Sequence, residues 1–356
     1  MAEEITPASD MFVAMTATGM TQITDGSYVA SLSSLQSSLF YFQCAVVAIG
    51  VVGTATNALI LYALVASKQH KKHVLIVNQN ALDVFSSFFL AITYSLRLCN
   101  IYLTGSTGYW LCTLLLSECF SWSGTIGSTI NLAIISVERY LKIVHRTWSK
   151  KHLRKWMIYS AAAFAWIGST IYLLALVFPT TKVIDGVCYP YTFWNNEMAA
   201  VAHLIWSFVS FYVITLLIFI FCYWRILAVI RHQASVMAGH GTSGGSSTNQ
   251  THYNHIQASV IKTMVLASLL YATTYFPSYV YVLLVALSPN FTYFDTGYYV
   301  SIFVTFLYNC ANPFIYATKL DPVKEILLRM IPCKKMEQGV GQASENVAPA
   351  RVGTTM

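Results

Sequence analysis

The 356-residue sequence predicts an all-α membrane protein, a bundle of seven transmembrane helices with a short amphipathic eighth helix along the bilayer. Three observations lead to this prediction. Hydrophobic residues make up 56% of the chain and charged residues only 10%, whereas soluble domains carry about a quarter charged residues. The apolar residues form seven runs, each long enough to cross a hydrocarbon core of about 30 Å. Lys and Arg are concentrated in alternate loops between the runs.

The seven predicted helices follow one another along the chain. They cover residues 39–66, 74–99, 109–142, 155–178, 198–230, 257–287 and 297–319. We expect residues 1–38 to form an extracellular tail, 39–319 the seven-helix domain, 320–333 the eighth helix and 334–356 a disordered cytoplasmic tail. The Gly- and Ser-rich stretch from Gly239 to Thr251 predicts a mobile loop.

The basic loops predict the orientation of the chain. They follow the first, third, fifth and seventh runs, whereas the other loops hold only Lys182, with Arg97 near a helix end. The positive-inside rule therefore places the N-terminus outside the cell and the C-terminus in the cytoplasm, as in a multi-pass protein of the plasma membrane. The net charge of +7 does not indicate a nucleic-acid partner, because the basic residues do not gather on one water-facing domain.

Asp83 lies inside the second run, where an ionised carboxylate needs partners. Asn57, Ser128, Asn309 and Asn312 are candidates to supply neutral oxygens to it. A carboxylate surrounded by such oxygens is a candidate site for an allosteric sodium ion, and no other cofactor is expected. The alternative is a protonated Asp83 that only packs through hydrogen bonds.

Glu138-Arg139-Tyr140 ends the third run and places a carboxylate beside a guanidinium at the mouth of the bundle. Such a pair can act as a latch that releases the arginine to a protein partner. The alternative is an ordinary interfacial arginine whose head reaches water. Pro277 and Pro313 each remove a helical hydrogen bond, so we expect the sixth and seventh helices to hinge there.

These features, in this order, resemble the class A (rhodopsin-like) G-protein-coupled receptors over residues 40–333. The residues that match positions typical of that family are Asn57, Asp83, Ser128, Glu138, Arg139, Tyr140, Trp166, Tyr223 and Asn312-Pro313-Phe314-Ile315-Tyr316. The resemblance implies a receptor that binds an extracellular ligand and activates a heterotrimeric G protein when the sixth helix moves outward. It also implies a bridge between Cys112 and Cys188, and a switch in which Tyr223 and Tyr316 take part.

The chain departs from the family pattern at several positions. Cys112 lies two residues further from Arg139 than is usual, so either the third helix begins irregularly or the bridge is displaced. Thr215 replaces the usual proline of the fifth helix, which should leave that helix straighter. Tyr275 replaces the common tryptophan of the sixth helix, and its hydroxyl needs a partner. Gln257 replaces an acidic residue, so only Glu138 is left to hold the arginine.

The residues expected at the extracellular helix ends limit the ligand. Ser121 stands where amine receptors carry aspartate, and Phe306 where opsins carry the retinal lysine, so neither ligand is expected. The candidate pocket side chains are Arg97, Glu118, Ser121, Trp122, His203, Tyr279, Tyr298 and Tyr299. They favour a peptide, with Arg97 binding a carboxylate; the alternative is that Arg97 pairs with Glu118.

The sequence also bears on two other function classes and on two covalent modifications. A multi-pass transporter is the alternative function, but the internal repeat typical of transporters is not found. An enzyme is not expected, because the histidines at positions 70, 73, 145, 152, 240, 252 and 255 fall in loops and form no cluster with acidic residues or cysteines. Asn290, in Asn290-Phe-Thr, is a candidate for glycosylation. Cys333 is a candidate for palmitoylation, with a free thiol as the alternative.

Overall fold

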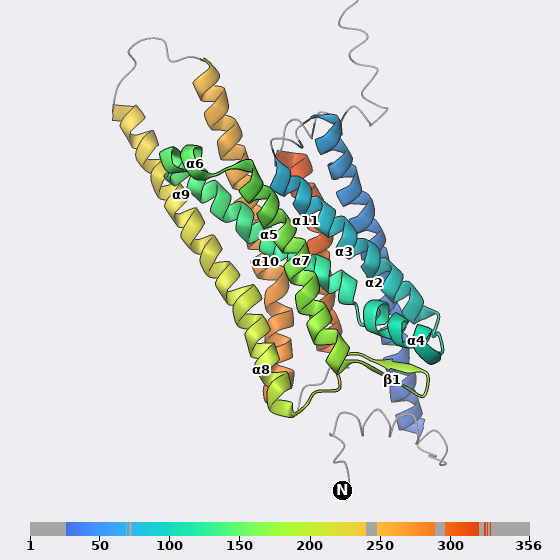
Figure 1. The fold of residues 1–356 in the computed structure, drawn as a ribbon. Helices are drawn as coiled ribbons and strands as arrows, with labels where there is room; N and C mark the ends of the chain where they lie inside the picture. Colours follow the sequence, from blue (N-terminus) through green and yellow to red (C-terminus); the bar gives the residue numbers. More distant parts are fainter. Residues whose placement is uncertain are drawn as a thin grey trace, which may run out of the picture.

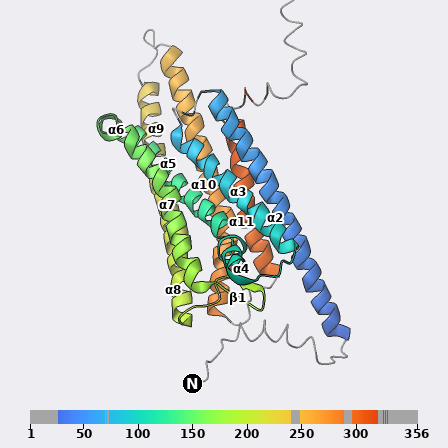
Figure 2. The ribbon, with the colours of Figure 1, turned by 45° about the vertical axis from the view of Figure 1, so that its right-hand side comes forward.

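The structure is a computed structural model, and it describes residues 26–68, 70, 73–239, 248–288, 296–319, 324, 326 and 328. Within these residues, the side chains of 26–35, 233–239, 248–260 and 316–319 are not described. Long helices run side by side in both views of the ribbon (Figures 1 and 2). We call the end that carries β1 and β2 the disulfide end, and the end that carries α6 the arginine end.

The described part of the chain contains seven long helical rods, two of which are interrupted. Their segments are α2 (Gly26–Ala66), α3 (Val74–Leu98), α4 (Gly105–Leu111) with the π turn η3 (Cys112–Leu116) and α5 (Cys119–Val144), α7 (Lys155–Thr180), α8 (Glu197–Ser207) with the π turn η4 (Phe208–Val213) and α9 (Ile214–Gly239), α10 (Thr248–Leu287), and α11 (Thr296–Lys319). The predicted seven-helix bundle is confirmed.

Five of these rods are long and apolar enough to cross a membrane by length and composition alone. The other two, α5 and α11, are less apolar because they carry the polar interior of the bundle. In α5 the polar buried residues are Ser121, Ser123, Thr125, Ser128, Thr129, Asn131, Ser136 and Glu138. The rod α5 contacts α3, α7 and α9, so these groups meet neighbouring helices.

Glycines let α5 approach its neighbours closely. A Cβ added at Gly124 would lie 2.9 Å from the Ser86 side chain of α3. One added at Gly127 would lie 2.9 Å from the carbonyl oxygen of Ala165 in α7. Close backbone approach of this kind is typical of helix packing in membranes, where dispersion and polar contacts replace the hydrophobic drive.

Several boundaries differ from those predicted. The first helix begins at Gly26, within the stretch 1–38 expected to form a tail. The sixth rod begins at Thr248, inside the expected mobile loop, whose residues 240–247 lie outside the description. A short helix, α6 (Arg146–His152), was not predicted. Of the expected eighth helix, residues 324, 326 and 328 are described and helical, and Ile326 packs against the main apolar core.

A two-stranded hairpin at the disulfide end was also not predicted. Strand β1 (Lys182–Ile184) pairs antiparallel with β2 (Val187–Tyr189), and Val183 lies opposite Cys188. The turn residues Asp185 and Gly186 have φ of 49° and 77°. Positive φ at both positions is typical of two-residue hairpins with an Asp-Gly turn.

Candidate ligand site and switch

The third rod is broken at the disulfide end, where the sequence predicted one continuous helix. The π turn η3 stops at Leu116, and α5 begins only at Cys119. Between them Glu118 adopts a left-handed conformation with φ of 61°. A non-glycine residue in the left-handed backbone conformation lowers the stability of the fold by about 1 to 3 kcal/mol, so the conformation persists only where surrounding contacts hold it.

The disulfide forms in spite of the two-residue offset. The sulfur atoms of Cys112 and Cys188 are bonded, with their Cα atoms 5.4 Å apart. The predicted pairing is confirmed, and the π turn and the break at Glu118 take up the extra residues. Of the two explanations offered for the offset, the irregular start of the third helix is therefore correct.

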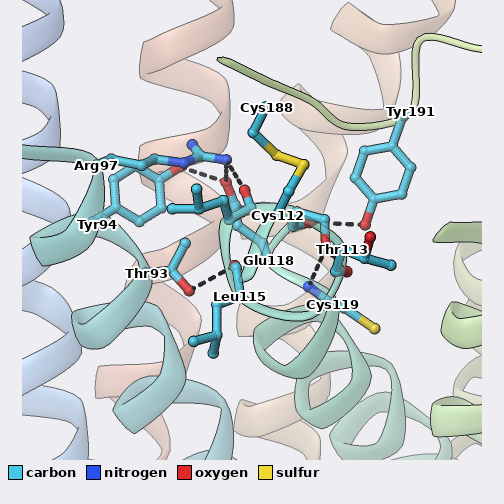
Figure 3. A network of polar contacts seen from close by, with 12 residues as sticks. Thr93, Tyr94, Arg97, Cys112, Thr113, Leu115, Glu118, Cys119, Cys188 and Tyr191 are labelled. Carbon is cyan, nitrogen blue, oxygen red and sulfur yellow. Dashed lines mark hydrogen bonds and ion pairs between the residues drawn. A yellow bond between two sulfur atoms is a disulfide. The ribbon is translucent and has the colours of Figure 1, made fainter. Parts of the chain in front are cut away.

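Side chains from outside the third rod donate hydrogen bonds to three carbonyl groups at the break, and one of these, that of Leu115, also accepts from the Glu118 backbone N–H at 2.8 Å (Figure 3). The three donors are Thr93, Arg97 and Tyr191, which bond the carbonyl oxygens of Leu115 (3.0 Å), Leu116 (2.7 Å) and Ser117 (2.9 Å) in that order. Loss of water raises the pKa of the Tyr191 phenol well above its ordinary value, so this hydroxyl keeps its proton and donates. The break is thus a stabilised local structure.

Arg97 and Glu118 form an ion pair of 2.9 Å beside these capped carbonyls. The Tyr94 hydroxyl donates to the same Glu118 oxygen at 3.0 Å. The Arg97 guanidinium also lies 4.8 Å from the centre of the Tyr94 ring, within the range of cation–π attraction. Figure 3 shows these three side chains converging at the break. Of the two interpretations of Arg97, the pairing with Glu118 is the one the geometry supports.

The other predicted pocket residues lie apart from this ion pair. Ser121 is buried and exchanges hydrogen bonds with Ser86 of α3, because each hydroxyl donates to the other residue's carbonyl oxygen. Ser121 therefore ties two helices together. His203 of α8 holds the Tyr172 hydroxyl at 2.8 Å through Nε2, while its Nδ1 is buried without a hydrogen-bond partner in the described residues.

The predicted aromatic residues form two groups. The Trp122 ring lies 5.6 Å from that of Phe306, and Tyr298 lies 5.9 Å from Tyr299. Tyr279 instead joins a cluster of tyrosines between η4 and α10. Trp122 and Tyr298 both pack against the apolar cluster between α2, α3 and α11. The candidate site is thus divided between the α3 side and the α10 side of the bundle.

Asp83 is fully buried in α3 and accepts hydrogen bonds at both oxygens. Ser128 donates to one oxygen at 2.6 Å, and Asn312 donates to the other at 2.9 Å. Asn57 and Asn309 bond other groups: the Asn57 amide donates to the Asn309 carbonyl oxygen of α11 at 2.7 Å, and the Asn309 amide donates to the Ser86 hydroxyl of α3 at 3.2 Å. Of the four residues predicted around Asp83, Ser128 and Asn312 bond it directly, and Asn57 and Asn309 belong to the surrounding polar network.

Several buried polar atoms around Asp83 have no hydrogen-bond partner in the described part of the chain. They include the Asn312 side-chain oxygen and the hydroxyls of Tyr275 and Tyr308. Both tyrosines interact electrostatically with Asp83. Unpaired oxygens close to a carboxylate fit the chemistry of a bound hard cation or of ordered water.

At the arginine end, Glu138 is buried and shared between two cations. Its carboxylate lies 3.4 Å from Arg139 and only 2.5 Å from Lys142, one turn further along α5. Tyr140 points away from this group and contacts the ring nitrogen of His145 at 3.0 Å. Glu138 and Arg139 form the expected ion pair, whose action as a latch stays a prediction, and Lys142 is an additional partner that was not predicted.

The Tyr223 hydroxyl connects three helices in this structure. It lies 2.8 Å from the Ser136 hydroxyl of α5 and receives a hydrogen bond of 3.2 Å from Ser268 of α10. Ser136 already donates its one proton to the carbonyl oxygen of Leu132, so Tyr223 must be the donor to Ser136. The Tyr223 hydroxyl is therefore hydrogen-bonded to one serine of α5 and one serine of α10.

The expected hinges lie within their helices, and a further irregularity appears in the fifth rod. Pro277 is inside α10 and Pro313 inside α11. The fifth rod was expected to be straighter because Thr215 replaces the usual proline, and the structure adds that the π turn η4 lies just before Thr215. The Tyr271 hydroxyl of α10 donates to the carbonyl oxygen of Phe211 in that turn, which stabilises it without a proline.

The sequence was compared with known families and structures. Residues 56–316 match the profile of the 7 transmembrane receptor (rhodopsin family). The chain belongs to this family. The receptor is therefore a membrane protein and not an enzyme, and its family implies G-protein coupling and an extracellular ligand. A transporter function is not favoured by this match.

The fold of the receptor is similar to that of squid rhodopsin. The crystal structure of that protein matches with a TM-score of 0.66, over 87% of this chain and 92% of that one, at 15% sequence identity. At this identity the likeness shows the fold alone. No curated protein matches the receptor sequence.

Sequence reasoning missed several residues of these sites. Tyr94 and Tyr191, which hold the broken rod, have no spacing signal because they come from other elements. Ser136 and Ser268 looked like ordinary small residues of apolar helices. Lys142 follows Glu138 by four residues, a spacing that predicts a helical ion pair and was available from the sequence.

Some predicted sites lie outside the described residues. These are Asn290, Cys333, and the side chains of Tyr316 and Gln257. Their proposed roles stay predictions from the sequence.

Proposed function

We propose that the receptor responds to an extracellular ligand by moving α10 outward at the arginine end and so admitting a G protein. The observation that carries this proposal is the Tyr223 hydroxyl between Ser136 of α5 and Ser268 of α10. While these bonds exist, α10 is tied to α5 and Tyr223 is not available to Arg139. Outward movement of α10 breaks the Ser268 bond and frees Tyr223.

The charges at the arginine end support the same interpretation. Arg139 lies against Glu138 and is neutralised by it, although Lys142 lies closer to the same carboxylate. A partner that binds Arg139 has to draw it away from Glu138. Lys142 keeps the carboxylate paired when that happens, which lowers the cost of releasing the arginine. The hinge at Pro277 gives α10 a point about which to bend.

We propose that the disulfide end faces outside the cell at the plasma membrane. A disulfide is stable in that oxidising environment. The helix α6 and its neighbours at the other end carry Arg139, Lys142, Lys150 and Lys151, as the positive-inside rule expects of cytoplasmic loops.

We propose that the ligand is a peptide that enters between the α3 and α10 sides of the bundle. The ion pair of Arg97 and Glu118 leaves the end of α3 with both charges but little net charge. Such a surface suits a peptide backbone with donors and acceptors better than a compact charged amine. The Arg97 side chain keeps 29% of its surface exposed, and the unpaired His203 Nδ1 offers a second polar contact.

We propose that a sodium ion binds at Asp83 and favours the inactive state. Asp83 and Ser128 would hold it, and the unpartnered oxygen of Asn312 would complete the site. The ion supplies a positive charge that offsets the buried carboxylate. The packing alternative for Asp83 predicts that sodium has no effect.

The switch is tested by comparing basal signalling, normalised to surface expression, across four variants. Ser268→Ala should raise basal signalling several-fold, because loss of one hydrogen bond to the tyrosine hydroxyl of about 1 kcal/mol shifts a two-state equilibrium by about fivefold. Thr273→Ala is the matched control, because its hydroxyl bonds only its own helix α10. Arg139→Ala should abolish signalling at normal surface levels, and Glu138→Gln should raise it. Full signalling by Arg139→Ala, or equal basal signalling by Ser268→Ala and the control, would contradict the proposal.

A further inference from the structure

A chain of hydrogen bonds enters the interior of the bundle from α7. The Trp166 indole donates to the Asn78 side-chain oxygen of α3 at 2.9 Å. The Asn78 amide donates to the Asn131 oxygen of α5, also at 2.9 Å. The Asn131 amide then donates to the Gln79 oxygen at 2.8 Å. Three neighbouring helices are thus joined by side chains that bond in series.

Gln79 extends this chain to the carboxylate of Asp83. Its amide donates to the Ser128 hydroxyl, and Ser128 donates to Asp83 at 2.6 Å. Gln79 and Ser128 have no exposed surface. Every link from Trp166 to Asp83 donates in the same direction, so the bonds polarise one another and end on the only ionisable group in the series.

Gln79 also fixes the orientation of the Ser128 hydroxyl. A hydroxyl has one proton and two lone pairs. Because Gln79 occupies one lone pair as a donor, the proton of Ser128 points to Asp83 and the second lone pair is left for a cation. Without Gln79 the hydroxyl is free to rotate about its bond to Cβ, and the oxygen loses its set direction.

We propose that Gln79 is a positioning residue that couples the packing of α7, through Trp166, to cation binding at Asp83. This inference rests on the sodium site proposed above. The Gln79 amide donates to the Ser128 hydroxyl, which donates to Asp83, so the effect of Gln79 on the cation runs through Ser128. Remote partners that orient a metal ligand typically change metal affinity by about 10- to 100-fold when they are removed.

The test is a sodium titration of the thermal stability of the purified receptor, with sodium chloride exchanged for choline chloride at constant ionic strength. Gln79→Met removes both amide functions at similar volume, and we expect the half-saturating sodium concentration to rise about tenfold. Trp166→Phe should raise it less. The double variant should not exceed Gln79→Met alone, because both changes interrupt one series. Since the readout is a midpoint, a general loss of stability does not imitate the effect.

Two controls separate the possible failures. Ser169→Ala removes a buried hydroxyl of α7 that bonds only its own helix, and it should leave the sodium midpoint unchanged. Asp83→Asn should abolish the sodium response. If the native receptor does not respond to sodium, the sodium site and the coupling are both wrong. If Asp83→Asn abolishes the response while Gln79→Met keeps the native midpoint, or the Gln79 and Trp166 effects add, only the coupling is overturned.

Discussion

The ion pair of Arg97 and Glu118 should stabilise the receptor measurably, and a pair of variants can isolate its contribution. Glu118→Gln keeps an acceptor oxygen but removes the negative charge, so the guanidinium loses its counter-ion and retains the Leu116 carbonyl oxygen and the face of Tyr94. Removing one partner of a fully buried pair costs about 3 to 5 kcal/mol. The Arg97 and Glu118 side chains are 29% and 10% exposed, so solvent screens part of their attraction. We therefore expect the free energy of unfolding to fall by about 2 kcal/mol.

The assay is thermal unfolding of the purified receptor, followed with a thiol-reactive fluorophore. The exposed free thiol of Cys99 reacts in the folded receptor and sets the baseline, whereas Cys119 and Cys222 are buried and become reactive on unfolding, so the rise above that baseline reports unfolding. A loss of about 2 kcal/mol should lower Tm by roughly 5 °C. Arg97→Gln should behave in the same way. The double variant should lose less than the sum of the two, because each single change leaves one charge unpaired.

An exposed carboxylate at the same end provides the control. Glu197 lies in the first turn of α8, and Glu197→Gln should lower Tm by no more than about 1 °C. The reasoning would be refuted if Glu118→Gln were as stable as Glu197→Gln. It would also be refuted if the effects of the Arg97 and Glu118 changes were strictly additive.

Three further predictions concern other parts of the receptor. Cys188→Ala removes a disulfide between cysteines 76 residues apart, and it should lower the free energy of unfolding by about 2 to 4 kcal/mol. Its Tm should be lower than that of a control variant in which a free cysteine, outside the disulfide, is replaced by alanine. Gly127→Ala should reduce the folded fraction in detergent, because its Cβ would lie 2.9 Å from a backbone oxygen of α7, whereas Gly168→Ala meets nothing closer than 3.5 Å and should be tolerated. A glycosidase should shift the gel mobility of the native receptor but not of Asn290→Gln. A second sequon, Asn249-Gln-Thr, lies in the loop expected in the cytoplasm, and a shift that depended on Asn249 instead would invert the proposed orientation.

The helices could be predicted because their cause is local in the sequence. Runs of about 20 apolar residues have to form helices in lipid, since every backbone group must be bonded within its own segment. The boundaries of α3 and α7 were accordingly close to those predicted. The Cys112–Cys188 bridge was predicted from the family resemblance, and spacing alone did not supply it.

The offset of Cys112 pointed to an irregular start of the third helix as one of two alternatives, but the position and form of the break could not be predicted, because their causes lie in other elements. Glu118 is an ordinary helix former, and nothing next to it in the sequence ends a helix. The groups that stabilise the break are Thr93 and Arg97 of α3 and Tyr191 after β2. The hairpin is different, since Asp185-Gly186 is a local turn signal that the sequence analysis passed over.

The break also fixes the register in which this receptor has to be compared with its relatives. A continuous helix turns by about 100° per residue, so an offset of two residues rotates every side chain by about 200° around the axis. A comparison anchored on Cys112 that assumes an unbroken helix would therefore place Glu118 on the wrong face of α5, away from Arg97. An alignment of residue numbers that starts from Arg139 assigns each residue to the correct helix face from Cys119 onward. An alignment that starts from Cys112 does so only as far as Leu116. When ligand contacts of other receptors are transferred to the disulfide end, residues before Glu118 have to be aligned from Cys112 and residues after it from Arg139.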